Sequence, residues 1–425
     1  MKDKKTRVFS NYEAFIIAIL AILQFTIILD FMVLSPLGAI LMDELNIRPS
    51  QFGLVVSAYA FSAGASGLLA AGFADKYDRK KFLLFFYAGF LGGTFLCAIA
   101  PSYELLLAAR IVTGIFGGVI SSVSFAIITD MFKLEVRGRV MGFVQMAFAA
   151  SQILGIPIGL VLANKFGWHA PFWMICAFGL VVGVVILMYM KPVTSHLAIK
   201  SERSAFRHLI KTVSEPHYVQ AFLATTLLAT GGFMLMPFGS AFSIHNLGLT
   251  MEQLPVLYGV TGLFAIMFGP VVGKLSDSIG KFRVFAIGSV MSIAMVLIYT
   301  HLGITPLWMV ISLNVVLFIG ITARIISAQA LMTAIPEPQD RGAFMSINSS
   351  VQQISGGVAS AVAGLIVVQE GSGKLLHYGT LGYVVTGSMI VCAVMMFYIN
   401  RLVIKRASMK MKASTLPVGE FPVEI

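Results

Sequence analysis

The feature that most constrains this chain is the regular return of apolar stretches about 20 residues long, the length of a helix that crosses a ~30 Å hydrocarbon core. Apolar residues make up 58% of the 425 residues and charged residues only 12%, and the mean hydropathy is +0.89. These values exclude a soluble enzyme and a disordered chain. Lipid offers no partners to open backbone groups, so the stretches must be helices. The sequence therefore predicts an all-α membrane protein.

Charged residues, Pro and Gly divide the apolar stretches into twelve predicted spans, in two sets of six. The first set comprises 14–41, 51–73, 82–100, 104–130, 140–163 and 170–190, and the second comprises 218–243, 253–273, 284–302, 306–332, 342–368 and 379–402. A long polar connection separates the two sets. We expect an N-terminal half (1–190), a cytoplasmic linker (191–217), a C-terminal half (218–402) and a cytoplasmic tail (403–425).

The positions of Lys and Arg predict the orientation of the chain, because loops on the cytoplasmic side carry an excess of both. Twenty-five of the 30 lie at the N-terminus, in alternate loops, in the linker and in the tail, whereas the opposite loops hold three. Arg110 and Arg324 lie inside spans. We therefore expect both termini to be cytoplasmic. The formal charge of +11 then reflects orientation and not nucleic-acid binding, and the basic linker is a solvated loop or a contact for anionic lipid.

The two halves repeat a charged segment. Asp75 follows the second span and Asp277 follows the eighth, and each precedes a tight turn and a basic cluster. The two acids are 202 positions apart, and the pairs Arg137-Gly138 and Arg341-Gly342 are 204 apart. Matched segments at a constant separation close to half the chain indicate an internal duplication.

Residues 71–81 resemble the loop signature of the major facilitator superfamily: Gly, three residues, Asp, a base, one residue, Gly, Arg and a base. Ala71 and Asp78 stand where the family has Gly. The resemblance covers essentially the whole chain. It implies twelve helices in two pseudo-symmetric halves, a monomer, and movement of a small-molecule substrate across the lipid bilayer by alternating access.

The resemblance also implies a cytoplasmic latch made by Asp75, Arg79, Asp130 and Asp277. In the family, the acid at the position of Asp75 meets the N-terminal amides of span eleven, whose partial positive charge it complements. Asp130, at the end of span four, is placed like the acid that receives the signature Arg, here Arg79. We expect the loss of either contact to favour the inward-open state. The alternative is that these charges only set orientation.

Asp30 lies inside the first span, ~16 Å from its outer end at 1.5 Å per residue. A carboxylate there is costly unless it is paired, hydrated or protonated, and burial favours its neutral form. An Asp followed six residues later by Pro36 resembles proton-coupled drug-efflux members of the superfamily. The resemblance implies that Asp30 carries the coupling proton. The alternative is a structural hydrogen bond to another helix.

Arg110 lies in the fourth span, ~9 Å below the outer surface. Residues 110–118 resemble the family's pattern of Arg, two residues, a polar residue, Gly and then small residues. Because spans one and four face the central cavity in that fold, the resemblance brings Arg110 within reach of Asp30. Release of the Arg when a proton arrives would then couple protonation to movement. The alternative is that Arg110 snorkels to the outer interface.

Span five carries Gly155, Pro157 and Gly159, which are similar to the Gly/Pro-rich motif of antiporters in the superfamily, although Gly and Pro are usually adjacent there. Gly and Pro predict close packing and a kink against the other half. The pattern is closer to the sugar-efflux relatives within the drug:proton antiporter branch.

The remaining charge inside a span is Arg324, which either binds an anionic substrate or reaches the nearby cytoplasmic surface. Polar residues inside spans are further candidates for the substrate cavity, although most such residues hold helices together. They are Gln24, Tyr59, Gln145, Gln152, Thr226, Tyr258, Asn348 and Gln352.

The sequence thus predicts a secondary active transporter that exports a small organic molecule, drug or sugar-like, in exchange for protons. Proton symport and uncoupled facilitation are alternatives, and a non-transporting receptor is a remote one. We expect no enzyme, because the chain has no HExxH, no Walker A sequence and no evident Ser/His/Asp set. The three Cys lie in apolar stretches and suggest no metal set. We expect the proton gradient in place of any cofactor, and a multi-pass location in a bacterial cytoplasmic membrane.

Overall fold

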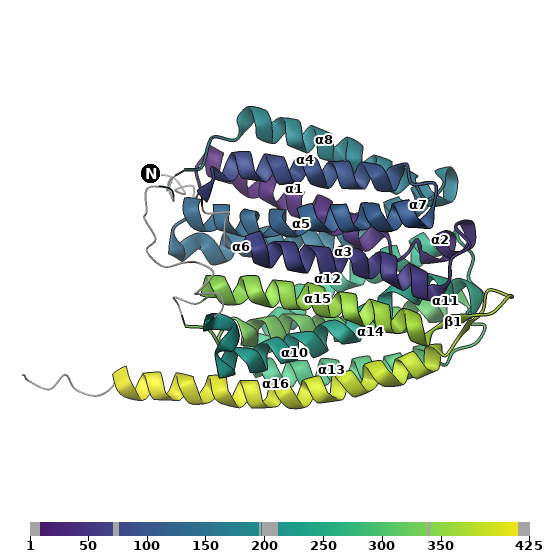
Figure 1. Cartoon of the computed structure of the whole chain (residues 1–425). Coiled ribbons are helices and arrows are strands. Elements are labelled where there is room, and N and C mark those ends of the chain that lie inside the picture. Colours follow the sequence, from purple (N-terminus) through teal and green to yellow (C-terminus); the bar gives the residue numbers. More distant parts are fainter. Residues whose placement is uncertain (1–8, 71–75, 195–196, 198–210, 338–340, 415–425) are drawn as a thin grey trace, which may run out of the picture.

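The computed structural model describes residues 9–70, 76–194, 197, 211–337 and 341–414, which form mainly helices running along one bundle (Figure 1). The helices of the first half are α1 (Asn11–Val33), α2 (Gly38–Glu44), α3 (Pro49–Ala70), α4 (Arg79–Ala98), α5 (Tyr103–Met131), α6 (Leu134–Ala150), the π-helix η2 (Ser151–Gly155), α7 (Ile156–Phe166) and α8 (Ala170–Tyr189). Those of the second half are α10 (Pro216–Phe233), the 3₁₀-helix η4 (Met236–Phe238), α11 (Gly239–His245), α12 (Leu254–Ile279), α13 (Lys281–Tyr299), α14 (Leu307–Met332), α15 (Arg341–Ile366) and α16 (Tyr378–Ser414).

Ten helices in the described part of the chain are long and apolar enough to cross a membrane. The predicted fifth span is instead divided into α6, η2 and α7, and the predicted eleventh span, α15, is rich in Ser, Gly, Asn and Gln. Both lie within the bundle, α15 against α3 and α6 against α1. The prediction of a helical membrane protein is confirmed, whereas the count of twelve spans remains a prediction.

Short polar segments determine where the helices begin. At the start of α1, Ser10 Oγ accepts a hydrogen bond from the Glu13 amide at 3.2 Å, and the Glu13 carboxylate accepts from the Ser10 amide at 2.8 Å. This reciprocal pair is a capping box. Asp78 caps α4 in a similar way by accepting from the Lys80 amide at 2.8 Å. Gly280, with a φ of +103°, makes the turn from α12 into α13.

The two halves meet along α3 and α15, and along η2 and α7 against α12 (Figure 1). Small residues bring α3 and α15 close together, since a Cβ atom added to Gly53 would lie 2.8 Å from the Ser360 carbonyl oxygen. Ser57 Oγ also donates to the carbonyl oxygen of Gly357 at 2.8 Å. The two halves are therefore in contact where the backbones of α3 and α15 approach each other closely, which small side chains allow.

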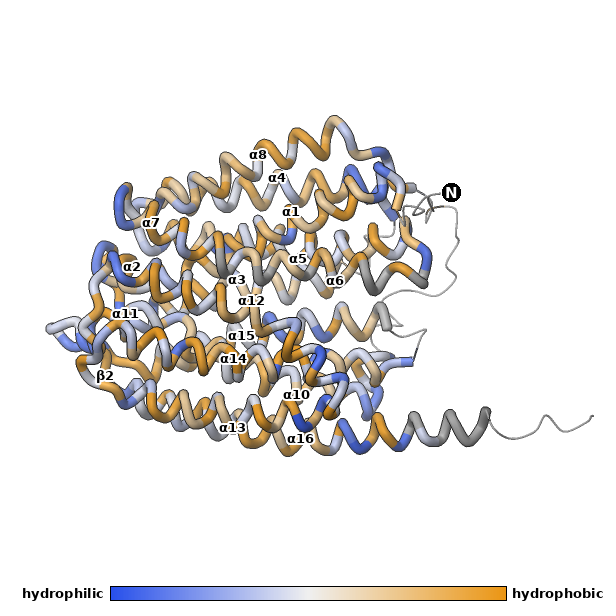
Figure 2. Tube along the Cα trace, turned by 180° about the vertical axis from the view of Figure 1, so that it is seen from behind, coloured by the Kyte–Doolittle hydropathy of each residue, from blue (hydrophilic) through white to orange (hydrophobic). Residues whose placement is uncertain are grey.

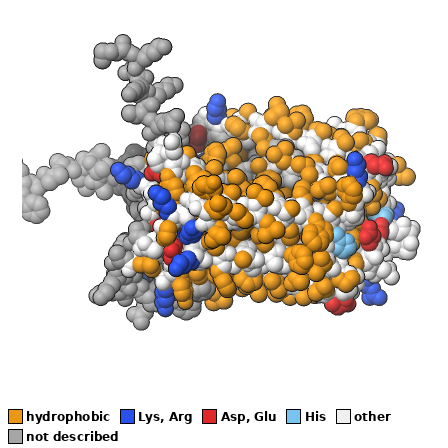
Figure 3. Space-filling model, turned by 90° about the horizontal axis from the view of Figure 1, so that it is seen from above, with side chains coloured by type: hydrophobic (Ala, Val, Ile, Leu, Met, Phe, Trp, Pro, Cys, Tyr) orange, Lys and Arg blue, Asp and Glu red, His pale blue; other side chains and the backbone are white. Residues whose placement is uncertain are grey.

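The first described turn of α1 and the last described turn of α16 lie at the same end of the bundle, which we call the inner end (Figure 1). Apolar residues dominate the helices along most of their length, and hydrophilic residues gather toward the two ends (Figure 2). The same band of apolar side chains covers the face seen in Figure 3. The two termini thus emerge on one side of the bundle, and the assignment of that side to the cytoplasm remains a prediction.

At the opposite end, which we call the outer end, the described residues of both halves share an apolar core. There one cluster joins Phe52 of α3 to Phe238 and to residues of α11 and α12. Ser240 Oγ of α11 donates to the carbonyl oxygen of Ser35 at 3.3 Å. At the inner end each half has its own core, and Leu68 of α3 is the residue of the first half that packs against the second core. Toward the inner end α3 and α15 stay close, since a Cβ atom added to Gly67 would lie 3.5 Å from the Ser350 Oγ atom.

Two features add to what the sequence predicted. A small antiparallel hairpin, β1 (Val368–Gln369) and β2 (Leu375–Leu376), joins α15 to α16 at the outer end of the helical bundle. The Asn246 side chain holds it through two hydrogen bonds of 2.9 Å to the backbone of Leu375. In addition, α16 continues to Ser414 and extends past the bundle (Figure 1), so the expected start of the tail at 403 falls inside a helix.

Candidate functional site

Asp30 of α1 and Arg110 of α5 form an ion pair inside the first half. The Arg110 Nη1 atom lies 2.7 Å from the Asp30 Oδ2 atom, and both side chains are 0% exposed. The same Nη1 atom lies 3.4 Å from the Asp30 carbonyl oxygen. The structure thus joins two residues that are 80 positions apart. Arg110 does not snorkel to the outer interface.

Two further side chains surround this pair. Thr94 of α4 donates a hydrogen bond of 3.1 Å to the Asp30 Oδ1 atom, so both carboxylate oxygens have a donor. The ring of Tyr59, which is 1% exposed, lies 4.5 Å from the guanidinium carbon of Arg110. A cation over an aromatic face is stabilised by the ring quadrupole. The Nε and Nη2 atoms of Arg110 are buried without hydrogen-bond partners among the described residues.

Glycines in α5 allow this arrangement. A Cβ atom at Gly114 would lie 3.0 Å from the Tyr59 Cα atom, and one at Gly118 would collide with the backbone of Ala63. The absence of side chains at these positions lets α5 approach α3 closely, as small residues do in membrane helix pairs. The small-residue pattern that follows Arg110 in the sequence therefore has a direct packing role, since it places the Tyr59 ring beside the guanidinium.

The pair has no net charge while both members are ionised, which makes burial of the two charges tolerable. A proton on Asp30 would remove the attraction and leave an uncompensated guanidinium. The site is neutral overall when Asp30 is ionised and carries one positive charge when Asp30 is protonated. The neutral state is stable in a dry protein interior, whereas the charged state favours contact with water or with another anion. This is the chemical property that a proton-coupling site requires.

Of the predicted latch, the structure brings together Arg79 and Asp130. The Arg79 Nε atom lies 2.9 Å from the Asp130 Oδ2 atom, and the Arg79 side chain is buried. Both residues belong to the first half, so this pair ties α4 to α5 and does not itself bridge the halves. Asp277 is largely exposed and lies 3.8 Å from Lys281 on the neighbouring helix. Asp75 lies outside the described residues.

Two predicted cavity residues, Thr226 and Asn348, take part in hydrogen bonds between α10 and α15. Thr225 Oγ1 donates to Asn348 Oδ1 at 2.6 Å. Ser355 Oγ donates to Thr226 Oγ1 at 3.0 Å. These contacts place Thr226 and Asn348 in a polar seam of the second half. They are the hydrogen bonds that hold two helices together, and a substrate would have to compete with them.

The other predicted cavity residues are scattered. Gln24 is buried in α1, where its Oε1 atom accepts from Ser121 Oγ at 3.4 Å and its Nε2 atom has no partner among the described residues. The hydroxyl of Tyr258 lies near Gly239 at the outer end, and Gln352 is exposed on α15. Gln145 and Gln152 are on α6 and η2, but their side chains are outside the described set.

Arg324 lies in the interior of the second half. It is 3% exposed, and its guanidinium carbon is 5.6 Å from the ring of Phe285 on α13. A Cβ atom on Gly231 of α10 would lie 3.7 Å from its Nη1 atom. Its Nε and Nη2 atoms have no hydrogen-bond partner among the described residues. Arg324 is thus a buried cation without a described carboxylate partner, and it does not reach the surface.

The span-five motif has contacts on two sides. A Cβ atom on Gly155 would collide with Leu29 of α1, and one on Gly159 would lie 2.6 Å from Val33. Pro157 faces Gly259 of α12, in the other half. The two glycines therefore allow close packing within their own half, and the proline contacts the other half. The helix interruption at this point is the π-helix η2.

The family model of the Major Facilitator Superfamily matches residues 20–360 and, in a second match, 221–416. The chain belongs to the major facilitator superfamily. The first match runs through both predicted halves, and the second begins three residues into the predicted C-terminal half.

Three relatives with curated names illustrate the range of this superfamily. The uncharacterized MFS-type transporter YceJ of Bacillus subtilis is 29% identical over 346 residues, or 81% of this chain and 87% of YceJ. Multidrug resistance protein 2 of B. subtilis is 24% identical over 277 residues, or 63% and 69%. A probable sugar efflux transporter of Mannheimia succiniciproducens is 19% identical over 358 residues, or 84% and 87%.

Among solved structures, the chain resembles a bacterial homologue of the human lysosomal transporter Spinster in an inward-facing, unoccupied conformation. The TM-score is 0.71 at 15% identity, and the match covers 93% of this chain and 97% of the other. At this identity the likeness shows the fold, and the predicted major facilitator fold is confirmed. The protein is an MFS transporter by family, and its family is not one of enzymes.

Sequence reasoning missed three polar residues of this transporter. Thr94 contacts Asp30, and Thr225 and Ser355 lie in the seam between α10 and α15. Nothing in the sequence separates these hydroxyls from others that bond to a carbonyl of their own helix, as Thr226 also does. Only the packing of the helices shows which of them reach a neighbour.

Proposed function

We propose that this transporter exports a small organic molecule, drug or sugar-like, in exchange for protons. The observation that carries the proposal is the fully buried ion pair between Asp30 and Arg110, at 2.7 Å. A carboxylate inside a membrane bundle is retained against a cost of several kcal/mol, which makes a functional role the default interpretation. Relatives named for multidrug resistance and for sugar efflux support export as the direction.

Each side chain has a distinct role in this proposal. Asp30 binds a proton when the bundle opens to the outside, and Arg110 loses its partner. In the inward-facing state Asp30 releases the proton and pairs with Arg110 again, through the contact between Nη1 and Oδ2. Thr94 orients the carboxylate. The two halves rock about the site in alternating access, and the proton gradient supplies the energy without a cofactor.

The same proposal places the protein as a monomer in a bacterial cytoplasmic membrane, with both termini inside. Its latch comprises the pair Arg79–Asp130 together with Asp75 and Asp277. Proton symport is the second candidate, because an ion pair of this kind serves either direction of coupling. An uncoupled facilitator does not require a protonatable group at this depth. A receptor does not require two halves that move relative to each other.

The test is proton movement in proteoliposomes that contain the purified protein and a pH-sensitive dye, with lipophilic cations and sugars added in turn. We expect a substrate gradient to drive protons in the opposite direction in the wild type. Asp30→Asn should abolish proton flux, while Glu252→Gln, which alters an exposed acid in an outer loop, should leave it unchanged.

Each other outcome selects a different mechanism. Proton flux in the same direction as the substrate would replace antiport by symport. Substrate counterflow that is free of proton flux and unchanged in Asp30→Asn would show a facilitator, and would reduce the ion pair to a structural contact.

A further inference from the structure

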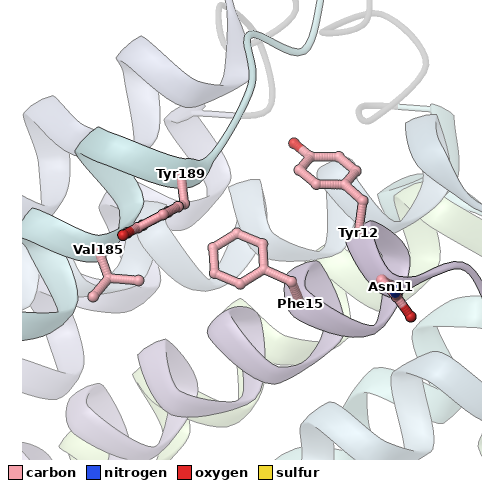
Figure 4. A pocket seen from close by; sticks show the side chains of 5 residues that line it. All are labelled: Asn11, Tyr12, Phe15, Val185 and Tyr189. Carbon is pink, nitrogen blue, oxygen red and sulfur yellow. The ribbon is translucent and has the colours of Figure 1, made fainter.

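A shallow pocket lies on the outside of the first half, where α1 begins and α8 ends. It has a volume of about 470 Å³ and is lined by Asn11, Tyr12, Phe15, Val185 and Tyr189. Figure 4 shows Phe15 projecting from α1 into the space between Tyr12 and Tyr189. This position is at the inner end of the bundle, far along α1 from Asp30, so the pocket is separate from the proposed coupling site.

The walls of the pocket are largely aromatic. The ring centroids of Tyr12 and Phe15 are 6.2 Å apart, and those of Phe15 and Tyr189 are 6.4 Å apart. Tyr189 is 63% exposed, and Leu187 and Met188 beside it are 60% and 68% exposed. Tyrosines at the ends of membrane helices typically mark the level of the lipid headgroups. The pocket therefore opens toward acyl chains on one side and headgroups on the other.

Two lysines contact the helix ends that carry the pocket, one at the Tyr12 ring and one at the end of α8. The Lys191 Nζ atom lies 5.2 Å from the centroid of the Tyr12 ring, and the Lys191 amide donates to the Tyr12 hydroxyl at 2.9 Å. The Lys80 Nζ atom donates to the Leu187 carbonyl oxygen at 2.9 Å. An ammonium group has three donors, and among the described residues this contact uses one of those of Lys80. Lys191 is thus held beside the Tyr12 ring, and Lys80 is held at the C-terminal end of α8.

The nearby acids are engaged with backbone amides. Asp78 Oδ1 accepts from the amides of Lys80 and Val193, at 2.8 and 3.1 Å. Glu13 Oε2 accepts from the Ser10 amide at 2.8 Å. Neither acid forms a described ion pair with the two lysines. The helix ends next to the apolar pocket therefore carry two cations without a described acidic partner, which suits an anionic phospholipid.

We propose that this pocket binds one anionic phospholipid of the inner leaflet. Its phosphate group lies between Lys80 and Lys191, and the upper part of an acyl chain rests on Phe15, Val185 and Tyr189. A soluble anion would use the lysines but not the apolar floor, and a neutral lipid would use the floor but not the lysines. The arrangement of both features in one pocket selects a ligand that has both.

The test is native mass spectrometry of the full-length protein from micelles with equal amounts of phosphatidylglycerol and phosphatidylethanolamine. We expect the wild type to retain phosphatidylglycerol preferentially. The double variant Lys80→Gln/Lys191→Gln should lose about fivefold in preference for each lysine removed. Lys165→Gln, which alters an exposed lysine at the opposite end of the bundle, is the matched control and should behave as wild type.

A second comparison tests the apolar floor. Phe15→Ala should lower the retention of both lipids, while Phe166→Ala, which removes a ring that is 72% exposed at the outer end, should not. Thermal unfolding of each variant in the same micelles separates a loss of binding from a loss of folding. An unchanged preference in a folded double variant, or an equal loss in Lys165→Gln, would overturn the proposal. Displacement of the lipid by glycerol phosphate, which lacks acyl chains, would also overturn it in favour of a soluble anion.

Discussion

Thr94 of α4 donates a 3.1 Å hydrogen bond to the Asp30 Oδ1 atom, while Arg110 occupies Oδ2. The carboxylate is thus held by donors from two different helices. One of these donors is neutral, and it can be removed without changing the net charge of the site. This allows the protonation of Asp30 to be perturbed separately from its ion pair.

Thr94→Val keeps the shape of the side chain and removes the donor. A hydrogen bond to a charged group contributes about 1.5–3 kcal/mol, which corresponds to about one pH unit or more. Because the bond favours the ionised carboxylate, its loss should move the pH profile of substrate-driven proton flux to higher pH. Thr94→Ser should keep the wild-type profile. A profile that is the same in both variants would show that Thr94 does not act on Asp30.

Arg110→Gln should be severely destabilising, because it leaves a buried carboxylate uncompensated. Breaking one member of a buried pair typically costs about 3–5 kcal/mol. The double variant Asp30→Asn/Arg110→Gln removes both charges and should recover most of the lost stability, but not proton coupling. The measurement is thermal unfolding of all four proteins in detergent, read as a double-mutant cycle. Additive effects would mean that the two residues do not interact.

Gly53→Ala should weaken the closure of the outer end. The added Cβ would lie 2.8 Å from the Ser360 carbonyl oxygen, and backbone cannot move aside as a flexible side chain does. A cysteine introduced at Ser240, which is 0% exposed between the halves, should then react faster with an impermeant maleimide added outside. Gly92→Ala is the control, because no atom lies within 4 Å of the added Cβ. Equal labelling rates in the two variants would contradict the expectation.

Arg324→Met should preserve or raise stability, because the guanidinium is buried without a described carboxylate partner. Replacing even a buried ion pair by apolar side chains of similar volume is often neutral or stabilising by about 1–4 kcal/mol, and a single buried charge has no ionic partner to offset its desolvation cost. The melting temperature should stay constant or rise by a few degrees. Transport should then be compared for neutral and anionic substrates. A loss confined to anionic substrates would assign Arg324 a contact with substrate, as proposed from its position in span ten.

Hydropathy was sufficient to predict a helical membrane protein, because a membrane demands long apolar helices. The pairing of Arg110 with Asp30 was also within reach, since the resemblance placed both spans around one cavity. The environment of Arg324 could not be predicted, because the sequence shows that a cation lies in a span but does not show which neighbours it faces. Thr94 was missed for the same reason. Its role depends on the rotation of α4, which no motif in the sequence reports.

The fifth predicted span shows a different limit. Its apolar pattern is continuous, yet the structure places a π-helix at Ser151–Gly155. Ser151 Oγ reaches the carbonyl oxygen of Phe25 at 3.1 Å from this turn, and Gly155 packs against Leu29. Close approach to α1 thus determines the local backbone. Hydrophobic periodicity does not contain that information.

The same π-helix should make the chain tolerant of a one-residue deletion at this position. A π turn closes its hydrogen bond from residue i to i+5, one residue more than an α turn. The segment therefore stores an additional residue while α6 and α7 on either side keep the faces they present to α1 and α12. Removal of one residue within 151–155 should allow a continuous α-helix with both faces in place, whereas the same deletion within α5 would rotate everything after it by about 100°. Natural length variation among homologues is accordingly expected to concentrate at this turn of the membrane core.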